Sequence, residues 1–571
     1  MSVRAVVRTF VAAVVLAAVT SNALPAPAAT TGTATVSVVG SAVKVRPMDQ
    51  PNGSAGASLT AARNEFESFQ VVVAAGASPL TGLSVALDSP LAGPGGTIPA
   101  SNVTVYREAY YDVTKVSDQE GATGRWPDAL IPTVDPYFHE PRSAFPIDVP
   151  AGENRVAWVD VLVPVDAKAG DYDGTVAVIA DGGFAVSVPV HLIVLKFAIP
   201  STSSLASAFG MDWDTPCLAA YGESCITHES DGWRLKGLYT KAALDDRITI
   251  SYPQYQPLAS SQERGWFEQY ILPLLNGTAP TKLPGAKLTS LDVDTGSWLK
   301  SWKAEAEAKG FADRAFVYAC DEPNTSASSW KYCKSRASAA LAKWPAVSIL
   351  ITSTIDNADR FGATSLIHTM VPIVNEMDDK PGSSSYSGNQ RSNYQAFLTD
   401  PRNRLWMYTS CESEGCTGDS SSSYFNGWPG YPIDAPASEA RAMGWLSFEY
   451  RTTGELYYAT DIDLTTAWTD QFDFGGNGDG TLFYPGQPGT CAVGCVGGAD
   501  PIPIESMRMK LIRDGYEDYE WLRWLTAHGQ GARARAVVKS LFPRMFDTNR
   551  TDGAVQAARA QLAALASNVT G

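Results

Sequence analysis

The sequence lacks the short motifs of several large enzyme classes. It contains no His-Glu-x-x-His zinc helix, no Gly-x-Ser-x-Gly nucleophile elbow, no Gly-x-x-x-x-Gly-Lys phosphate loop and no Gly-x-Gly-x-x-Gly loop after a strand. Only five histidines occur in 571 residues, and no pair of them lies near enough to the cysteines to complete a zinc site. These absences count against zinc peptidases, serine hydrolases and nucleotide-dependent enzymes, and we expect no metal and no cofactor.

Basic residues are also scarce. The 44 lysines and arginines are outnumbered by 60 aspartates and glutamates, which gives a formal net charge of −16. Nucleic acid and anionic membranes are poor partners for such a chain, because their own negative charge repels it. Aromatic residues, in contrast, are plentiful, with 15 Trp, 23 Tyr and 20 Phe. Their faces suit a protein that binds neutral sugars, although aromatic rings also fill cores.

Long apolar runs are missing outside the N-terminus. Arg4 and Arg8 precede an apolar run from Phe10 to Val19, and small residues follow around Ala23 to Ala28. This run is too short to span a bilayer, and no later run approaches the roughly 20 residues that spanning requires. The pattern predicts a signal peptide over residues 1–28, removed near residue 28, and a secreted protein without a membrane span.

The eight cysteines fall as close neighbours along the chain. Their spacings do not match a zinc ribbon, and disulfides are typical of exported proteins. From proximity alone we predict four local disulfides. The pairs are Cys217 with Cys225, Cys320 with Cys333, Cys411 with Cys416, and Cys491 with Cys495.

A change in hydrophobic period divides the chain. Residues 31–200 carry short β-branched runs separated by Gly- and Asp-rich turns, as in an antiparallel β-sandwich. Beyond a Ser-rich linker, residues 205–527 alternate short apolar runs with amphipathic segments, as in βα units. Residues 528–571 are an alanine-rich helical tail. The predicted fold is therefore multi-domain β plus α/β: an N-terminal antiparallel β-sandwich, a (β/α)8-like TIM-barrel catalytic domain and a short helical C-terminal tail.

The second domain contains eight candidate strands, the number for a closed barrel. They are 207–210, 248–252, 288–293, 315–319, 347–352, 367–372, 405–409 and 455–459, with 482–484 as a possible extra strand that would make the barrel irregular. Helices are expected over 233–245, 261–275, 297–308, 326–341, 437–445 and 504–525, the last interrupted at Gly515.

The fourth candidate strand ends in two adjacent carboxylates, Asp321 and Glu322, followed by Pro323. One interpretation is structural: Asp321 caps the next helix, and Glu322 is an acidic residue of its first turn. The other is catalytic, because barrel enzymes carry their catalytic groups at the carboxyl ends of strands. These residues alone leave both interpretations open.

Other polar and aromatic residues lie at or beyond the strand ends. We predict that they form an acidic cleft, edged by aromatic rings, that binds a sugar. The candidate substrate-binding residues are Trp213, Asn375, Trp406, Tyr408, Trp468 and Tyr484. The loop from Gly475 to Gly480 lacks the spaced carboxylates and the terminal Glu of an EF-hand, so we expect a flexible turn there rather than a calcium site.

Six segments form a recognisable series. They are Asn64–Gln70, Trp126–Pro132, Gly152–Asn154 leading to Trp158–Val159, Pro164–Gly174, the Asp321–Glu322 pair and Arg513–Glu520. In this order the chain resembles glycoside hydrolase family 123 and the domain of unknown-function family 4091, over about residues 35–525. The resemblance implies a β-sandwich packed on a (β/α)8-like domain, and an exo-acting β-N-acetylgalactosaminidase activity. We interpret Arg513–Glu520 as a helix surface that closes the barrel.

The resemblance also implies roles for the two carboxylates. Asp321 orients and polarises the 2-acetamido group of the substrate, and Glu322 is the general acid and then the base. Adjacent residues cannot easily straddle a sugar, but they suffice if the substrate's own amide oxygen attacks the anomeric carbon. A tyrosine beside the acetamido group is implied too, with Tyr408 as candidate and Tyr458 or Tyr484 as alternatives. The expected function is cleavage, with retention, of a terminal β-linked N-acetylhexosamine.

Two alternatives stay open. In the first, Glu322 acts with a distant carboxylate, such as Asp292, Glu376 or Asp461, in a retaining or inverting glycosidase of another sugar specificity. In the second, the chain is a non-catalytic carbohydrate-binding protein built on a glycosidase scaffold.

Overall fold

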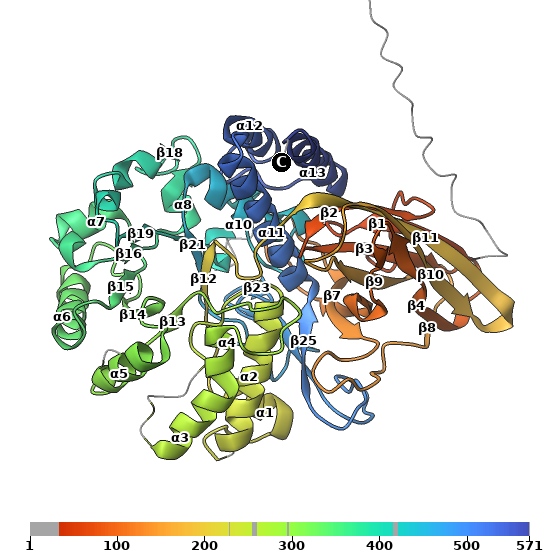
Figure 1. Cartoon of the computed structure of the whole chain (residues 1–571), viewed down its shortest axis with the longest axis horizontal. Helices are drawn as coiled ribbons and strands as arrows, with labels where there is room; N and C mark the ends of the chain where they lie inside the picture. The colour runs from red at the N-terminus through yellow and green to blue at the C-terminus, as the bar shows by residue number, and fades with distance from the viewer. Residues whose placement is uncertain are drawn as a thin grey trace, which may run out of the picture.

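The computed structural model describes residues 34–227, 229–253, 258, 260–293, 296–414 and 421–569. They form a mixed α/β protein, in which a β-rich half lies beside a half built of short parallel strands and surrounding helices (Figure 1). The predicted signal peptide lies outside the described residues. Within those residues, every helix is too short or too polar to cross a membrane.

The N-terminal half is a pair of packed sheets. One sheet has the order β1 (Thr35–Gly40), β3 (Phe66–Ala74), β9 (Asn154–Leu162), β6 (Val103–Val113), β7 (Gly124–Pro132), β25 (Ile502–Ser506) and β24 (Phe483–Gly486). The other has the order β2 (Ala57–Arg63), β11 (Phe184–Ala198), β10 (Gly170–Ala180), β4 (Leu80–Gly93) and β5 (Gly96–Thr97), and β8 (Ile147–Val149) pairs with β4. All these pairings are antiparallel except β2 with β11, which is parallel.

Alternation explains why the two sheets pack. Along β11 the side chains of Val188, Val190, Leu192 and Val194 are buried, while the residues between them are less buried. Because successive side chains of a strand point to opposite faces, this pattern gives the sheet one apolar face. These residues form a common core with valines of β3 and β9 from the facing sheet.

The extra strand predicted at 482–484 forms as β24, but it belongs to a different sheet. β24 pairs with β25, and β25 pairs with β7 of the N-terminal sheet. The chain therefore returns to the first half after the last parallel strand. An apolar run shows that a strand forms but not which edge accepts it, because pairing depends on residues far away in sequence.

The second half contains the parallel strands. They are β12 (Ala206–Phe209), β13 (Leu291–Asp292), β14 (Ala315–Cys320), β15 (Ser348–Ile351), β16 (Thr369–Met370), β19 (Arg404–Leu405), β20 (Met407–Tyr408) and β21 (Gly454–Tyr457). Every predicted range contains a strand except 248–252, which contributes one parallel bridge from Ile250 to Phe209. Parallel pairings run from β13 to β19, and β20 pairs with β21, which pairs with β12.

Helices surround these strands and fill the space between the two halves (Figure 1). They are α1 (Thr215–Tyr221), α2 (Glu229–Asp245), α3 (Ser261–Trp266), α4 (Leu272–Asn276), α5 (Leu299–Lys309), α6 (Ala327–Lys343), α7 (Ile355–Arg360), α8 (Val374–Met377), α9 (Cys411–Glu414), α10 (Ala437–Tyr450), α11 (Met507–Ala527), α12 (Gly531–Leu541) and α13 (Asp552–Ser567). The last two form the predicted helical tail.

The predicted interruption at Gly515 is wrong, because α11 runs through it. This glycine instead lets α10 approach closely. A Cβ placed on Gly515 would lie 2.4 Å from the carbonyl oxygen of Arg441, and one on Gly444 would lie 1.9 Å from the carbonyl oxygen of Gly515. Two helices that cross at this distance leave no room for a side chain at either position.

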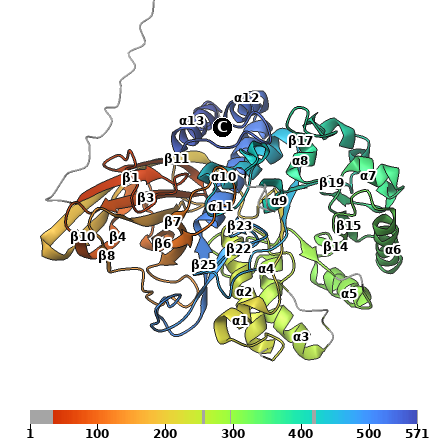
Figure 2. The same ribbon diagram turned by 180° about the vertical axis from the view of Figure 1, so that it is seen from behind.

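The stretch Arg513–Glu520 is buried, which corrects the prediction of a helix surface. It lies in α11, between the N-terminal sheet and the parallel strands (Figure 2). The guanidinium of Arg513 donates to Asp160 of β9 at 2.8 and 3.1 Å and to Ser68 of β3 at 2.8 Å. Burial alone would raise the pKa of Asp160, but the charges of Arg513 and Lys510 outweigh it and hold the pKa well below its usual value. A charged, paired side chain is therefore enclosed between the two halves.

Replacing Arg513 by Met should lower the free energy of unfolding by about 3–5 kcal/mol, because it leaves the buried carboxylate of Asp160 without the guanidinium that bonds to both of its oxygens. Urea denaturation measures this, and Arg523→Met, on the exposed side of the same helix, should cost less than about 1 kcal/mol. Because the folded pKa of Asp160 is depressed, the pair contributes above the unfolded pKa of about 4, and its contribution fades as pH falls. A gap between wild type and Arg513→Met that did not shrink below pH ~4 would contradict this account.

Candidate active site

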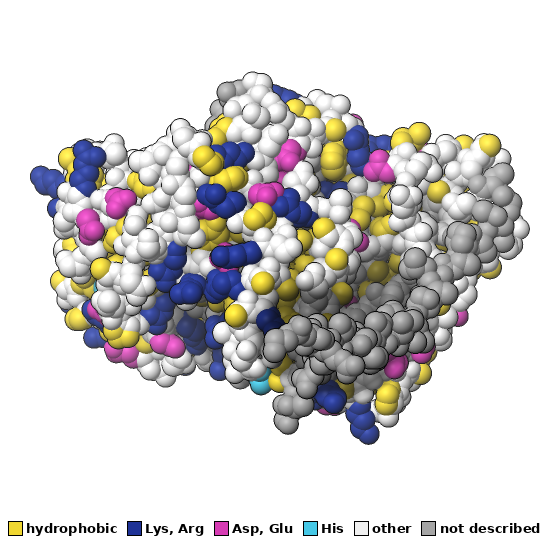
Figure 3. Space-filling model, turned by 90° about the horizontal axis from the view of Figure 1, so that it is seen from above, with side chains coloured by type: hydrophobic (Ala, Val, Ile, Leu, Met, Phe, Trp, Pro, Cys, Tyr) yellow, Lys and Arg dark blue, Asp and Glu magenta, His cyan; other side chains and the backbone are white. Residues whose placement is uncertain are grey.

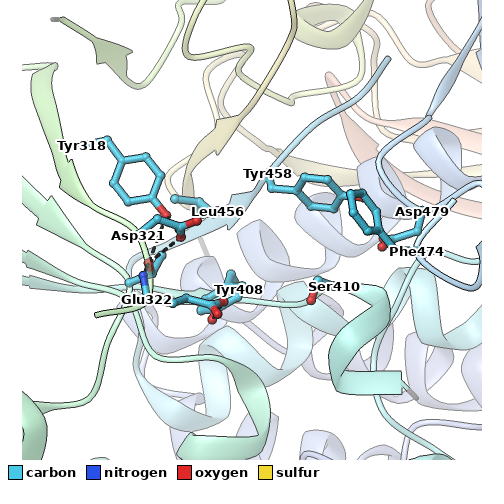
Figure 4. A pocket seen from close by; sticks show the side chains of 10 residues that line it. Tyr318, Asp321, Glu322, Tyr408, Ser410, Leu456, Tyr458, Phe474 and Asp479 are labelled. Carbon is cyan, nitrogen blue, oxygen red and sulfur yellow. Dashed lines mark hydrogen bonds between the residues drawn. The ribbon is translucent and has the colours of Figure 1, made fainter. Parts of the chain in front are cut away.

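A pocket of about 280 Å³ opens at the carboxyl ends of the parallel strands (Figure 4). Eight of its lining residues lie near or just after the carboxyl ends of β14, β15, β20 and β21. The other two, Phe474 and Asp479, come from the loop after β21. The full set is Tyr318, Asp321, Glu322, Thr352, Tyr408, Ser410, Leu456, Tyr458, Phe474 and Asp479. Parallel strands present these ends at one edge, which explains why Tyr318 and Tyr458, 140 positions apart, line the same pocket.

The two adjacent carboxylates are held by different partners. Asp321 Oδ1 accepts hydrogen bonds from the Tyr318 hydroxyl at 2.6 Å and from Thr352 Oγ1 at 3.0 Å. Glu322 Oε1 accepts one from the Tyr408 hydroxyl. Figure 4 shows the two side chains diverging, Asp321 toward Tyr318 and Glu322 toward Tyr408. Each carboxylate therefore addresses a different part of the pocket.

Both tyrosines act as donors. Burial, and then the charge of Asp321, raises the pKa of Tyr318 well above its usual value. Burial, and then the charge of Glu322, raises the pKa of Tyr408 in the same way. A phenol that keeps its proton serves a carboxylate as a hydrogen-bond donor. The pocket thus contains two carboxylate–phenol pairs.

The structural interpretation of Asp321 and Glu322, together called the acid pair, is wrong. The cap of α6 is Ser326, whose hydroxyl accepts from the backbone N–H of Ser329 at 3.3 Å, so Asp321 does not cap the helix. Glu322 lies outside the helix and has a φ of 36°. This left-handed backbone conformation is energetically unfavourable for a residue other than glycine. Its backbone N–H donates to Thr352 Oγ1 at 2.9 Å, which holds this turn against the neighbouring strand.

Three of the four predicted disulfides are present in the structure, and one of these three borders the site. Cys320, the last residue of β14, is bonded to Cys333 of α6. The bonds Cys217–Cys225 and Cys491–Cys495 also form. The remaining prediction, Cys411–Cys416, is not tested because Cys416 lies outside the described residues. The bond at Cys320 ties the strand end that carries the acid pair to the following helix.

The far wall of the pocket is a short hairpin, and it includes part of the Gly475–Gly480 stretch that was expected to be a flexible turn. β22 (Phe472–Asp473) pairs with β23 (Gly476–Asn477), and Phe474 at its tip is 57% exposed beside the pocket. Burial raises the pKa of Asp479 to about 6, against the opposing effect of hydrogen bonds from Tyr457 and Tyr458. In the described residues, no group of three His, Cys, Asp or Glu side chains is placed to hold a metal ion.

The hairpin is fixed from the N-terminal half. The side-chain amide of Asn477 donates to the carbonyl oxygen of Lys115 at 2.9 Å, to Ser117 Oγ at 3.0 Å and to Asp434 Oδ1 at 3.1 Å. Asn477 is 1% exposed. One wall of the pocket therefore depends on a loop that follows β6 of the N-terminal sheet.

A second pocket of about 330 Å³ adjoins the first at the same edge. Tyr318, Leu456 and Tyr458 line both, and the second adds Asp212 and Asp292, among others. Asp292 Oδ1 accepts from the backbone N–H of Tyr318 at 3.2 Å. The two pockets therefore lie next to each other and share part of one wall.

Of the six residues predicted to bind substrate, Tyr408 alone lines either pocket. Trp213 packs edge-on against Trp233, with ring centroids 5.2 Å apart. Trp468 packs on Tyr484, whose hydroxyl donates to Asp128 at 2.7 Å. The remaining two also lie elsewhere: Asn375 donates to the carbonyl oxygen of Ser413 and to the Tyr424 hydroxyl, and Trp406 packs against Phe316.

The three distant carboxylates considered above differ in position. Asp292 lines the second pocket, while Asp461 and Glu376 line neither. Asp461 is fully buried and accepts from the backbone N–H of Asp212 at 3.0 Å. Burial raises its pKa to about 7, although the charge of Lys236 opposes the shift.

Sequence reasoning missed Tyr318, Thr352, Phe474 and Asp479. Tyr318 and Thr352 were within reach, because each lies at the end of a predicted strand and the ends of parallel strands converge. Phe474 and Asp479 belong to a Gly-rich loop that gave no sign of its place in the pocket.

The opposite end of the parallel strands is basic. A pocket of about 290 Å³ there is lined by Arg314, Arg402, Arg404 and Trp406, among others, and lacks the acid pair. On the face seen in Figure 3, Lys and Arg side chains gather left of centre, although the chain as a whole is acidic. The acid pair and the arginines thus lie at opposite ends of the parallel strands.

Two solved glycoside hydrolases differ in how closely they resemble this fold. A family 123 glycoside hydrolase from Clostridium perfringens, studied for glycolipid glycan hydrolysis, superposes with a TM-score of 0.65 and 13% identity, over 94% of this chain and 97% of that one. A family 39 glycoside hydrolase from Bacteroides cellulosilyticus WH2 reaches a TM-score of only 0.31 at 8% identity, over 70% of this chain and 79% of that one. This score is too low to indicate a shared fold. No family model and no curated protein matches the sequence. The chain therefore shares the fold of the clostridial glycoside hydrolase.

Replacing Asn477 by Ala should loosen the hairpin, because it removes the three side-chain bonds to Lys115, Ser117 and Asp434 and leaves, toward these residues, only the backbone bond from residue 477 to Ser117 Oγ at 2.9 Å. We expect the amides of residues 472–480 to exchange hydrogen at least about tenfold faster, which native-state exchange with mass spectrometry measures. Asn393→Ala, at an exposed position, is the matched control and should leave that segment unchanged. Unchanged exchange in Asn477→Ala would show that the hairpin is held by other contacts.

Proposed function

We propose that this chain is a secreted glycoside hydrolase that cleaves a terminal β-linked N-acetylhexosamine, N-acetylgalactosamine by family resemblance, with retention. The supporting observation is the pair Asp321–Glu322 at a strand end, with each carboxylate facing the pocket on its own phenol donor. We also propose that the parallel strands form a (β/α)8-like barrel within residues 205–527, preceded by a β-sandwich domain over residues 31–200 and by a cleaved signal peptide. The three disulfides are typical of an exported protein.

The adjacency of the two carboxylates supports one mechanism over the others. A retaining glycosidase with a protein nucleophile needs two carboxyl groups about 5–5.5 Å apart across the scissile bond, and an inverting one needs about 6.5–9.5 Å. Two neighbours on one strand tip, both on the same side of a sugar, do not straddle that bond. They suit a reaction in which the substrate supplies the nucleophile and the protein supplies a proton donor and an orienting group.

In the first step, the acetamido oxygen attacks the anomeric carbon while Glu322 donates a proton to the departing glycosidic oxygen. The product is a cyclised oxazolinium ion and a free alcohol. Asp321 Oδ1 is held by Tyr318 and Thr352, and Oδ2 accepts the amide N–H and stabilises the positive charge that develops. In the second step Glu322 takes a proton from water, which attacks the anomeric carbon and reopens the ring. Two inversions give net retention.

The remaining walls bind the sugar. Tyr458 and Phe474 lie edge-to-face with ring centroids 6.0 Å apart and present aromatic surface to the pocket. Tyr408 holds Glu322 in place. The adjoining pocket at Asp292 has room for the group released, or for the next sugar of a glycan.

Replacing Glu322 by Gln should lower kcat/KM about 10²- to 10⁴-fold on a β-N-acetylgalactosaminide with a poor leaving group, because the proton donor is lost. The loss should be smaller for a nitrophenyl leaving group, which departs with less protonation. Steady-state kinetics measures both, and Glu307→Gln, on the exposed side of α5, is the control. Full activity of Glu322→Gln on both substrates would refute the proposed acid.

Replacing Asp321 by Asn should cost about 10²- to 10³-fold on the acetamido substrate, because the developing charge loses its stabilising carboxylate. A thiazoline that mimics the cyclised acetamido intermediate should inhibit the wild type and should bind Asp321→Asn more weakly. If the thiazoline fails to inhibit an active enzyme, a distant carboxylate such as Asp292 becomes the nucleophile or base. If no nitrophenyl glycoside is hydrolysed, with or without an acetamido group, and the chain binds a glycan on an array without turnover, the alternative of a binding protein on this fold is supported.

A further inference from the structure

The basic pocket at the opposite end of the parallel strands has no part in the proposed hydrolysis. It has a volume of about 290 Å³ and lies at the amino ends of β12, β14, β15, β16 and β19. It shares no lining residue with the pocket of the acid pair, and only Phe316 with the second pocket. In barrels of parallel strands this end usually contributes to stability. A pocket lined by arginines and hydroxyl groups is therefore unexpected there.

The side chains that the argument uses lie on one face of the sheet. Arg404 and Trp406 are two residues apart, and such side chains point to the same face of an extended chain. Thr369 of β16 is the register partner of Arg404, and Ser348 of β15 is the register partner of Phe316. All five residues line the pocket. A ligand in it can therefore reach them from a single side.

Trp406 brings a buried hydrogen-bond donor to this pocket. The residue is 7% exposed, and among the described residues no atom accepts a hydrogen bond from its indole Nε1. The indole lies against Gly454, where an added Cβ would lie 2.5 Å from Nε1, and the neighbouring Thr453 lines the pocket. Buried indole N–H groups usually have an acceptor. An acceptor bound in the pocket would complete the pairing of this donor.

Arg404 is a cation without a carboxylate partner in the described part of the chain. Its Nη1 donates to the carbonyl oxygens of Pro401 at 2.5 Å and of Asn403 at 2.9 Å. Its Nε and Nη2 have no acceptor among the same residues. These two nitrogens form the edge of the guanidinium that binds carboxylates and phosphates through two parallel hydrogen bonds. Because the carbonyl groups hold Nη1, this edge is already oriented for an anion.

The neighbouring arginines add positive charge. Arg402 pairs with Asp400 at 3.1 Å, and the Nε of Arg314 lies 3.7 Å from Asp313. Three guanidinium groups therefore face two carboxylates, which leaves one positive charge on a chain of net charge −16. This local surplus favours an anionic ligand.

Two hydroxyl groups supply a further donor. Ser348 Oγ and Thr369 Oγ1 lie 3.0 Å apart and share one hydrogen bond. Each hydroxyl has a single hydrogen, so this bond uses only one of the two. The other hydrogen has no acceptor among the described residues and can bond to a ligand in the pocket.

We propose that this pocket binds a tetrahedral oxyanion, as a free ion or as the phosphate or sulfate ester of a saccharide. Arg404 pairs with the anion through Nε and Nη2, while the indole N–H of Trp406 and the spare hydroxyl hydrogen donate to its other oxygens. Four donors from one face match the several oxygens of a tetrahedral anion better than the two of a carboxylate. The site goes beyond the proposed hydrolysis and does not depend on it, because it uses no residue of the acid pair.

The test is calorimetry on the full chain at about 0.15 M NaCl. The probes are inorganic phosphate, inorganic sulfate, D-glucose 6-phosphate and D-galactose 6-sulfate, with acetate and D-glucose as the planar and neutral counterparts. We expect a Kd below about 1 mM for phosphate or sulfate, and binding of acetate at least about tenfold weaker. An ester that binds at least about tenfold more tightly than its inorganic ion would identify a saccharide as the source, and equal affinities would identify the anion alone. A pocket that holds only water would give no binding below about 10 mM, and this result, or equal binding of acetate, would overturn the proposal.

Two variants assign the binding to this pocket. Arg404→Met should weaken it at least about tenfold, and because Arg404 is exposed the variant should fold like wild type. Arg533→Met, which removes an exposed arginine from α12, is the matched control and should bind like wild type. Trp406→Phe keeps an aromatic ring but loses the N–H, and should weaken binding about three- to tenfold.

Unchanged affinity in Arg404→Met would overturn the proposal. The readout is binding and not hydrolysis, so this failure would leave the proposed function of the acid pair untouched. Conversely, an inactive Glu322→Gln enzyme should still bind the anion with the affinity of wild type.

Discussion

Buried ion pairs between helix α11 and its neighbours set the arrangement of the two halves. Arg508, Lys510 and Arg513 lie along one helix, each fully buried, and each meets carboxylates from other elements. Arg508 donates two hydrogen bonds, of 2.6 and 2.8 Å, to Asp128 of β7, and Arg513 donates to Asp160 of β9. A buried charge tolerates only a geometry in which its partner is in place, so these pairs define one relative orientation. The helix–helix contact at Gly444 and Gly515 has the same effect at van der Waals distance.

This interface reaches the pocket. Besides Asp128, Arg508 donates to the carbonyl oxygen of Gly478 at 2.7 Å, in the segment that carries Asp479. Asn477, one residue earlier, bonds to the loop after β6. The N-terminal sheet therefore does more than pack against the parallel strands, because it shapes the wall that faces the acid pair. The return of β24 and β25 to that sheet adds backbone strand pairing to the same connection.

The two acids illustrate how a turn carries chemistry. Asp321 and Glu322 leave the strand in a turn in which Glu322 has the unfavourable φ of 36°. The surrounding contacts hold this turn: a disulfide at Cys320, the Thr352 hydroxyl and the two phenols. A helix cap would need none of these. Residues that are strained, hydrogen-bonded by neighbours from other strands and open to a pocket are typical of a functional site.

The sequence by itself determined what depends on near neighbours. The alternation of apolar and polar residues predicted the strands of the two packed sheets, and the helical period predicted most of the helices. Cysteines close in sequence form disulfides because a short stretch of chain already brings them together. The acid pair at the end of β14 was found in the same way. Only the tertiary structure decided which sheet β24 joins, why Gly515 lies within a helix, and that Trp213, Trp468 and Tyr484 pack away from the pocket. The physical reason is that an aromatic ring or a strand edge has the same local pattern whether its partner is a core or a sugar, and the fold of the whole chain decides which partner it meets.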